Sequence, residues 1–235
     1  MREVRARDIT EKVSHLFQEA CYHLSDDVLA ALNRAKEIED SLVARSVLSM
    51  ILKNAEISAR EGIPLCQDTG MAVLFLELGQ EIHIVGGDLT TAINDGVRHA
   101  YQEGYLRKSV VERPFSSRVN TQDNTPAVIH TSIVPGNRLK INALSKGFGS
   151  ENMSRLGMLL PATGRQGIID FVVKTVDESG SNPCPPIIIG VGVGGTVEKC
   201  VLLAKKALLR KIGQPHSEAE VCDLEMEILA QVNNL

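Results

Sequence analysis

Three short segments of the chain combine carboxylate, amide or ammonium groups with small residues. They are Cys66-Gln67-Asp68-Thr69-Gly70, Asn120-Thr121-Gln122-Asp123-Asn124-Thr125 and Lys146-Gly147-Phe148-Gly149-Ser150-Glu151-Asn152. Each is predicted to be a loop beside a strand, and binding residues concentrate in such loops. Together these side chains suit a small, oxygen-rich ligand. Each segment taken alone also fits a solvated loop with local Asx turns.

The cysteines raise the possibility of a metal site. The chain has five, an odd and widely spaced number, which argues against a disulfide framework. Cys66 and Cys184 fall in predicted loops, and the prolines on both sides of Cys184 would hold a thiolate ligand in place. The separation of the two (184 − 66 = 118) matches no local zinc or ferredoxin motif. On the residues alone, two ordinary buried thiols are the simpler interpretation. The apolar faces of predicted helices carry the other three, Cys21, Cys200 and Cys222.

A glycine-rich turn after residue 189 has the form G-x-G-x-x-G, with Gly190, Gly192 and Gly195. It follows a predicted strand at 187–189 and precedes a predicted helix at 196–211, as in a dinucleotide-binding unit. No second strand with an acidic residue follows, which disfavours a nucleotide site. The turn then either binds an anion at the helix N-terminus or packs the strand closely on the helix.

Composition excludes several classes of protein. Lys and Arg number 25 against 29 Asp and Glu, so the net charge is 25 − 29 = −4, and aromatic residues make up only 3%. A nucleic-acid surface would lack both a positive field and stacking platforms. No apolar run approaches the ~20 residues of a membrane span, and the first residues lack a signal-peptide core. The expected compartment is the cytoplasm. The six histidines form no H-x-x-x-H or H-E-x-x-H pattern, and neither G-x-S-x-G nor a Walker A motif occurs.

Periodicity predicts the elements that must position these segments. Residues 1–60 are predicted to be helical, with an apolar stripe of Val13, Leu16, Ala20 and Leu24. Residues 61–235 are predicted to form a mixed sheet region with helices. Strands at 127–134 and 139–144 should form a hairpin around a Pro135-Gly136 type II turn. Helices should begin at Ser25, at Asp88 and at a Ser217/Glu220 capping box. The expected fold class is mixed α/β (α+β), in one structural domain.

The segments also occur in an order that resembles one enzyme family, the class I (iron–sulfur) fumarate hydratases and L(+)-tartrate dehydratases. Pro64-Leu65-Cys66-Gln67-Asp68-Thr69-Gly70 resembles the family's first cluster-ligand motif. Leu106-Arg107-Lys108-Ser109 resembles its substrate-binding arginine segment. The blocks beginning at Asn120 and Lys146 are similar to its N-x-x-D-N-x-P-A and K-G-x-G-x-E-N motifs. Asn182-Pro183-Cys184-Pro185-Pro186 is similar to its second cluster-ligand motif.

The resemblance implies an α-type subunit that binds a 4Fe–4S cluster through three thiolates, two of them Cys66 and Cys184. One iron with an open position would act as a Lewis acid. The substrate would contact Gln67, Asp68 and Arg107, and backbone N–H groups of Gly147 or Gly149. The implied reaction is reversible hydration of fumarate to malate, with L(+)-tartrate dehydration as the alternative. A homodimer of this part would pair with a β-type subunit or domain, which would carry the proton-transfer residues.

One cysteine of the family pattern has no counterpart here. The third ligand should follow the last predicted helix, and the sequence ends at Leu235, where that stretch should begin. Cys21, Cys200 and Cys222 stand in no matching motif. The chain alone is therefore expected to be inactive. An alternative from another class stays open, namely a truncated, non-catalytic homologue that binds a partner subunit or an anion.

Overall fold

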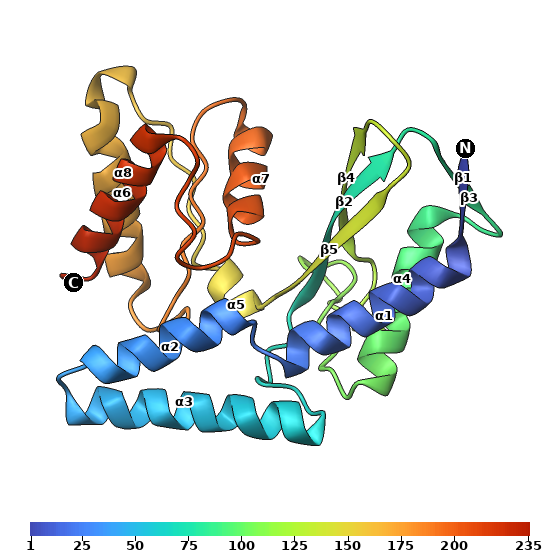
Figure 1. Ribbon diagram of the computed structural model, residues 1–235, viewed down its shortest axis with the longest axis horizontal. Helices are drawn as coiled ribbons and strands as arrows, with labels where there is room; N and C mark the ends of the chain where they lie inside the picture. Colours follow the sequence, from blue (N-terminus) through green and yellow to red (C-terminus); the bar gives the residue numbers. More distant parts are fainter. The chain divides into compact units, whose positions relative to one another are not determined.

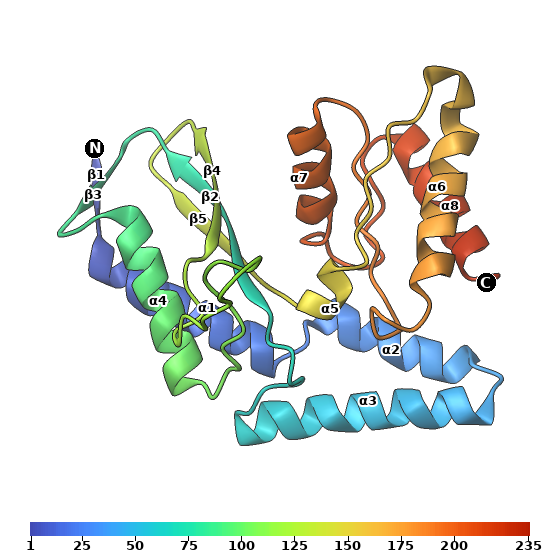
Figure 2. The same cartoon turned by 180° about the vertical axis from the view of Figure 1, so that it is seen from behind.

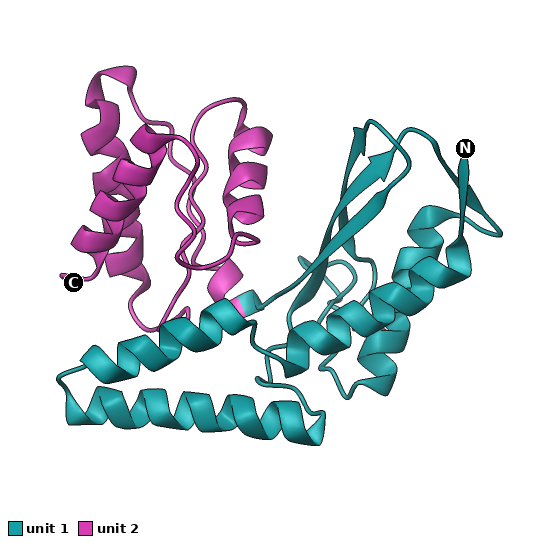
Figure 3. Ribbon diagram, in the orientation of Figure 1, with its two compact units in different colours: residues 1–148 teal, residues 149–235 magenta.

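The computed structural model describes residues 1–235, which form two compact units, residues 1–148 and 149–235 (Figure 3). Helices are combined with two small sheets, which confirms the predicted mixed α/β class. The helices of residues 1–60 belong to the same unit as the sheets. That the chain is one structural domain, with residues 61–235 as its mixed α/β region, stays a prediction.

Two helices pack side by side against the larger sheet of the first unit (Figures 1 and 2). They are α1, Ala6–Tyr22, and α4, Leu89–Glu103. A Cβ on Gly96 of α4 would lie 2.7 Å from the backbone oxygen of Thr10, so only glycine permits this approach. The buried stripe of α1 is Ile9, Val13, Phe17 and Cys21 rather than the stripe predicted through Leu16 and Ala20. Both stripes have helical spacing, and the position of α4 selects between them.

The larger sheet has three strands in the order β4–β2–β5. The central strand β2, Met71–Gly79, pairs in parallel with β4, Val128–Val134, and antiparallel with β5, Leu139–Lys146. Both predicted strands after residue 126 exist, but the predicted hairpin between them is wrong because β2 lies between the two. The apolar run of β2 explains this order, since residues 72–76 are all buried and a central strand satisfies both of its edges.

A second, two-stranded sheet pairs β1, Arg2–Arg5, in parallel with β3, Ile82–Val85. The sequence pattern does not predict β1, because its residues are mostly charged. The remaining helices of this unit are α2, Asp26–Ile38, and α3, Leu42–Glu61, which run side by side (Figures 1 and 2). Helix α3 ends at Gly62, whose φ of 63° is left-handed.

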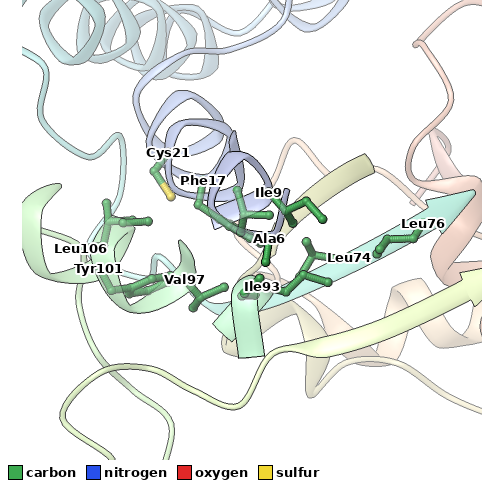
Figure 4. Packing of buried hydrophobic residues seen from close by; sticks show 14 residues of the cluster. Ala6, Ile9, Phe17, Cys21, Leu74, Leu76, Ile93, Val97, Tyr101 and Leu106 are labelled. Carbon is green, nitrogen blue, oxygen red and sulfur yellow. The ribbon is translucent and has the colours of Figure 1, made fainter. Parts of the chain in front are cut away.

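The core of the first unit lies between α1, α4 and one face of the sheet (Figure 4). Alternate residues of β2, Ala72, Leu74 and Leu76, face this core, as the period of a strand requires. At the far end of the core, Tyr101 and Leu106 lie near Cys21 in Figure 4, and both are buried. The core therefore reaches the segment that carries Arg107.

The second unit is mainly helical. It contains α6, Gly164–Ser179, α7, Val197–Ala207, and α8, Ala219–Val232, together with the short η1, Pro161–Thr163. The four-residue helix α5, Phe148–Glu151, begins at the boundary between the units. Helices α6 and α8 pack through Ile169, Val172 and Ile228. The predicted strand at 187–189 is absent, and Ile188 and Ile189 are exposed. The predicted capping box is also absent, because α8 starts at Ala219 with Glu218 as its N-cap. None of the helices in the chain combines the length and the apolar character that a membrane span needs.

Candidate functional site

The loop between α3 and β2 carries Cys66, Gln67 and Asp68. Its entry is fixed by a hydrogen bond from the Leu65 N–H to the Cys21 carbonyl, 2.9 Å. The Cys66 thiol is exposed; its sulfur accepts from the Asp68 N–H at 3.4 Å, and its S–H donates to the Gln67 side-chain oxygen at 3.5 Å. The interpretation of Cys66 as a buried structural thiol is therefore wrong. The loop carries a sulfur, a carboxamide and a carboxylate on three consecutive residues.

Buried hydrogen bonds hold the end of this loop at residues 69 and 70. The Tyr101 hydroxyl donates to the carbonyls of Thr69 and Gly70, at 2.7 and 3.1 Å. The Ser145 hydroxyl also donates to the Thr69 carbonyl. Burial is the main cause that raises the pKa of Tyr101, which therefore stays a neutral donor. The loop end is thus joined to α4 and to β5.

Gly70 brings the loop against the end of β5. Its φ is 65°, and an added Cβ would lie 2.2 Å from the Lys146 carbonyl oxygen and 2.7 Å from the Gly147 nitrogen. Both the left-handed backbone and the contact require glycine. Gly147, one of the expected substrate-binding residues, is therefore brought beside the loop of Cys66. Gly149, the other, falls in the second unit, where it is exposed.

Arg107 follows the buried Leu106 and is itself exposed. Its carbonyl accepts from the Thr69 hydroxyl at 3.0 Å, which ties it directly to the loop of Cys66. On its other side, the N–H groups of Ser109 and Val110 donate to the side-chain oxygen of Asn124, at 2.7 and 3.1 Å. The backbone of the arginine segment is fixed on both sides, and its guanidinium is left at the surface.

The segment that contains Asn124 has an ion pair of its own. Arg98 Nε lies 3.0 Å from Asp123 Oδ2, and the other carboxylate oxygen accepts from the Thr125 N–H and hydroxyl. Burial alone would raise the pKa of Asp123, but these hydrogen bonds and the Arg98 charge outweigh it and lower the pKa. Asp123 therefore stays ionised and ties residues 123–125 to α4.

In the second unit, Cys184 lies in the loop after α6. Its thiol is exposed, and its N–H donates to the Ser181 carbonyl at 3.0 Å. The residue has a φ of 60°, and the following Pro185–Pro186 peptide is cis. This thiol, too, is not the buried structural one that the simpler interpretation expected. Its exposure is what a ligand position requires.

The remaining cysteines lie in helices α1, α7 and α8, as predicted. Cys21 is buried, which raises the pKa of its thiol, and the thiol donates to the Ser145 hydroxyl at 3.4 Å. Cys200 in α7 donates to the Gly192 carbonyl at 2.9 Å. Cys222 is half-buried in α8. None of the three is presented on a loop.

The glycines after residue 189 pack the chain against α7. A Cβ on Gly190 would lie 2.2 Å from the Ala204 carbonyl oxygen, and one on Gly192 would lie 2.1 Å from that of Cys200. Of the two interpretations that the sequence left open, these contacts favour close packing.

The exposed thiols of these loops can be compared with the ligands that an iron–sulfur cluster uses. Thiolates are the usual ligands of iron–sulfur clusters, and Cys66 and Cys184 are the two exposed thiols of the chain. No group of three or more His, Cys, Asp or Glu side chains is arranged to hold a metal. Each of the two cysteines, taken by itself, has the chemistry and the exposure of a cluster ligand.

Sequence reasoning missed the residues that hold the site together. Tyr101, Thr69 and Ser145 were given no role, and Asn124 appeared only as a letter of a motif. The sequence pattern could have indicated a role for Tyr101. This tyrosine lies on the apolar face of α4, and a buried hydroxyl needs a hydrogen-bond partner.

The chain is similar to known proteins over almost its whole length. The family model described as Fumarate hydratase (Fumerase) matches residues 10–235. A Methanocaldococcus jannaschii protein named "Putative L(+)-tartrate dehydratase subunit alpha" is 40% identical over 232 residues, which cover 97% of this chain and 81% of that protein. The "L(+)-tartrate dehydratase subunit alpha" of Escherichia coli strain UTI89 is 29% identical over 231 residues, which cover 97% of this chain and 75% of the relative. The chain belongs to the fumarate hydratase (Fumerase) family, and with it to the hydro-lyases.

Proposed function

We propose that this chain is the α-type subunit of an iron–sulfur hydro-lyase that acts on a small dicarboxylate. One observation carries the proposal. A single hydrogen-bond network in the first unit joins the loop of Cys66 and Asp68 to the segment of Arg107. The backbone segments that carry a candidate metal ligand, a carboxylate and a guanidinium are thereby joined on one rigid support, as a site for an anionic ligand requires.

Cys66 and Cys184 are the residues that would hold a 4Fe–4S cluster. When bound, such a cluster supplies an iron with an open position, a Lewis acid that polarises a substrate hydroxyl. Both thiols are exposed on loops, so ligation needs no rearrangement of a core. The third thiolate that the family resemblance implies matches none of Cys21, Cys200 and Cys222.

The other proposed roles belong to polar groups around the Cys66 loop. Arg107 would bind a substrate carboxylate, because its planar guanidinium donates two parallel hydrogen bonds to such a group. Asp68 and Gln67 would accept from and donate to the hydroxyl of the substrate. Backbone N–H groups of Gly147 or Gly149 would bind the second carboxylate as neutral donors.

The names of the relatives favour L(+)-tartrate as the substrate, since both relatives reported above carry the name of a tartrate dehydratase subunit alpha. Fumarate and malate come second, on the description of the family model. The same names support a β-type subunit as partner, which would supply the proton-transfer groups. A homodimer of the α-type chain, and a compartment that keeps its five free thiols reduced, complete the proposal.

The test is anaerobic iron–sulfide reconstitution of the chain together with its β-type subunit. Visible absorbance reports the iron–thiolate cluster, and dehydration of L(+)-tartrate and of malate reports activity. We expect both signals in the wild type and in Cys222→Ser, a matched control in α8. Cys66→Ser and Cys184→Ser should lose both.

Three outcomes decide the proposal. Faster turnover of malate than of tartrate would reverse the order of substrates. A cluster that forms equally well in Cys66→Ser would mean that Cys66 is not a cluster ligand. Absence of both cluster and turnover in the wild-type pair would overturn the proposed cluster-dependent function and favour a non-catalytic homologue that binds its partner.

A further inference from the structure

Asn124 is the one fully buried asparagine side chain among the residues that surround the candidate site, with no exposed surface. Its side-chain oxygen accepts from the N–H groups of Ser109 and Val110, at 2.7 and 3.1 Å. Its side-chain nitrogen donates to the Gly70 carbonyl at 3.0 Å. One carboxamide therefore joins the arginine segment to the end of the Cys66 loop.

The same two segments are held by neighbours of Asn124. The Thr69 hydroxyl donates to the Arg107 carbonyl at 3.0 Å, and the Tyr101 hydroxyl donates to the Gly70 carbonyl that also accepts from Asn124. A carbonyl oxygen has two lone pairs, and Gly70 uses both. The loop end is consequently fixed from two directions, by α4 and by Asn124.

Asn124 is itself held in place. Its φ of 62° is left-handed, a conformation that asparagine adopts more readily than most residues. The Asn120 side chain donates to the Lys108 carbonyl at 3.0 Å, and the Thr121 N–H donates to the Val110 carbonyl at 3.0 Å. Together with the hydrogen bonds of Asn124, these bonds attach residues 120–124 to residues 108–110.

We propose that Asn124 is a positioning residue, which keeps Arg107 and the Cys66–Gly70 loop in one fixed arrangement. The inference rests on the proposed function, because Arg107 and Asp68 are there assigned to the substrate. A carboxamide places an acceptor for two N–H groups and a donor for a carbonyl on two separate atoms of one small side chain. An aspartate has the same shape, keeps the acceptor, and sets an oxygen against the Gly70 carbonyl.

This difference between the two side chains makes the test selective. Hydrogen–deuterium exchange would be followed in the wild type, Asn124→Asp, Asn124→Ala and Asn94→Asp. The last is a matched control, because the Asn94 side chain also accepts from a backbone N–H, that of Ala127 at 2.9 Å, but joins neither site segment. The rate of Cys66 alkylation in the cluster-free chain provides a second readout, and KM and kcat of the reconstituted pair provide a third.

In Asn124→Asp, exchange should rise at least about fivefold at residues 66–70, while Ser109 and Val110 keep their protection. Cys66 alkylation should rise with it. In Asn124→Ala both segments should exchange faster. The KM for the dicarboxylate should rise in the order wild type, Asp, Ala, with a smaller change in kcat, and Asn94→Asp should match the wild type. Asn124→Asp decides the matter even if Asn124→Ala fails to fold.

The proposal is overturned if exchange at residues 66–70 is unchanged in Asn124→Asp, or if it rises equally throughout residues 1–148. The first result would mean that Asn124 does not hold the loop, and the second that its role is stability alone. A wild-type pair without turnover would overturn the proposed function instead. The exchange and alkylation results would then still support or overturn the link between the two segments.

Discussion

The exposed guanidinium of Arg107 extends from a backbone that is fixed on both sides. If it binds a substrate carboxylate, Arg107→Gln removes a charge-assisted pair of hydrogen bonds, worth about 1.5–3 kcal/mol. We expect KM to rise about 10- to 100-fold in the reconstituted pair. Arg107→Lys should recover part of this loss, because it restores the charge without the planar fork.

The control for this change is Arg138→Gln, an exposed arginine in the turn between β4 and β5. Steady-state kinetics on all three variants would check the prediction. An unchanged KM in Arg107→Gln would mean that Arg107 does not bind the substrate.

Asp123 makes the stability of the first unit depend on pH. Its pKa is lowered in the folded state because hydrogen bonds from Thr125 and the charge of Arg98 outweigh burial. A carboxyl of this kind stabilises the fold above its unfolded pKa of about 4 and loses the effect as pH falls through the folded value.

Chemical unfolding of the wild type and Asp123→Asn from pH 7 downward would test this assignment. The wild type should be the more stable at pH 7, and the difference should shrink below about pH 4. A difference that stays constant over this range would mean that the charge of Asp123 contributes nothing to stability.

At the scale of single residues, the sequence suggests candidate ligand-binding groups but not the residues that support them. Cys66, Asp68 and Arg107 stand in motifs whose residue types suggest their chemistry. Tyr101 and Asn124 act on carbonyls that are far away in sequence, 31 and 54 residues from each. Such pairs are created by packing, and no local pattern encodes them.

At the scale of elements, Gly70 decides how the Cys66 loop meets β5. Gly70→Ala adds a Cβ that would lie 2.2 Å from the Lys146 carbonyl oxygen. Gly62→Ala is a close control, since Gly62 has nearly the same φ, 63°, but no atom within 4 Å of the added Cβ.

Both substitutions incur the cost of a left-handed backbone, about 1–2 kcal/mol. Gly70→Ala should lose in addition at least about 1–3 kcal/mol for the forced contact. Denaturant midpoints of the two variants would measure the difference. Equal losses of stability would mean that β5 shifts to accommodate the added Cβ, so that the close contact does not require glycine at position 70.

The elements themselves were predicted where the local pattern is decisive. Asp88 caps α4 as expected, and its carboxylate accepts from the Thr91 N–H at 2.7 Å. Ser25 is the N-cap of α2, although its side chain makes no capping hydrogen bond. The pairing of strands was not predicted, because two strands joined by a Pro-Gly turn favour a hairpin locally. The insertion of β2 between them depends on burial that only the assembled sheet shows.

At the scale of the whole molecule, the five thiols differ in their access to reagents. Cys66 and Cys184 are exposed, and Cys21 is buried with a raised pKa. In the cluster-free chain, alkylation should reach the first two cysteines first and Cys21 at least about tenfold more slowly.

Binding of a cluster should change which thiols react with the alkylating reagent. Reconstitution should protect Cys66 and Cys184 together, and removal of the iron by a chelator should expose both again. Mass spectrometry of the labelled peptides would show this. Protection of only one of the two would mean that the thiols do not hold the same group.

The order β4–β2–β5 has a consequence for the chain as it is being synthesised. Strand β2 ends at Gly79, but both of its partners come later, and β5 is complete only at Lys146. While the ribosome makes the residues between, the most apolar strand of the protein has two open edges. Open edges of this kind recruit other chains. The nascent polypeptide therefore passes through an aggregation-prone stage whose length is set by the distance from residue 79 to residue 146, and its yield in cells should depend on chaperones that cover this stretch.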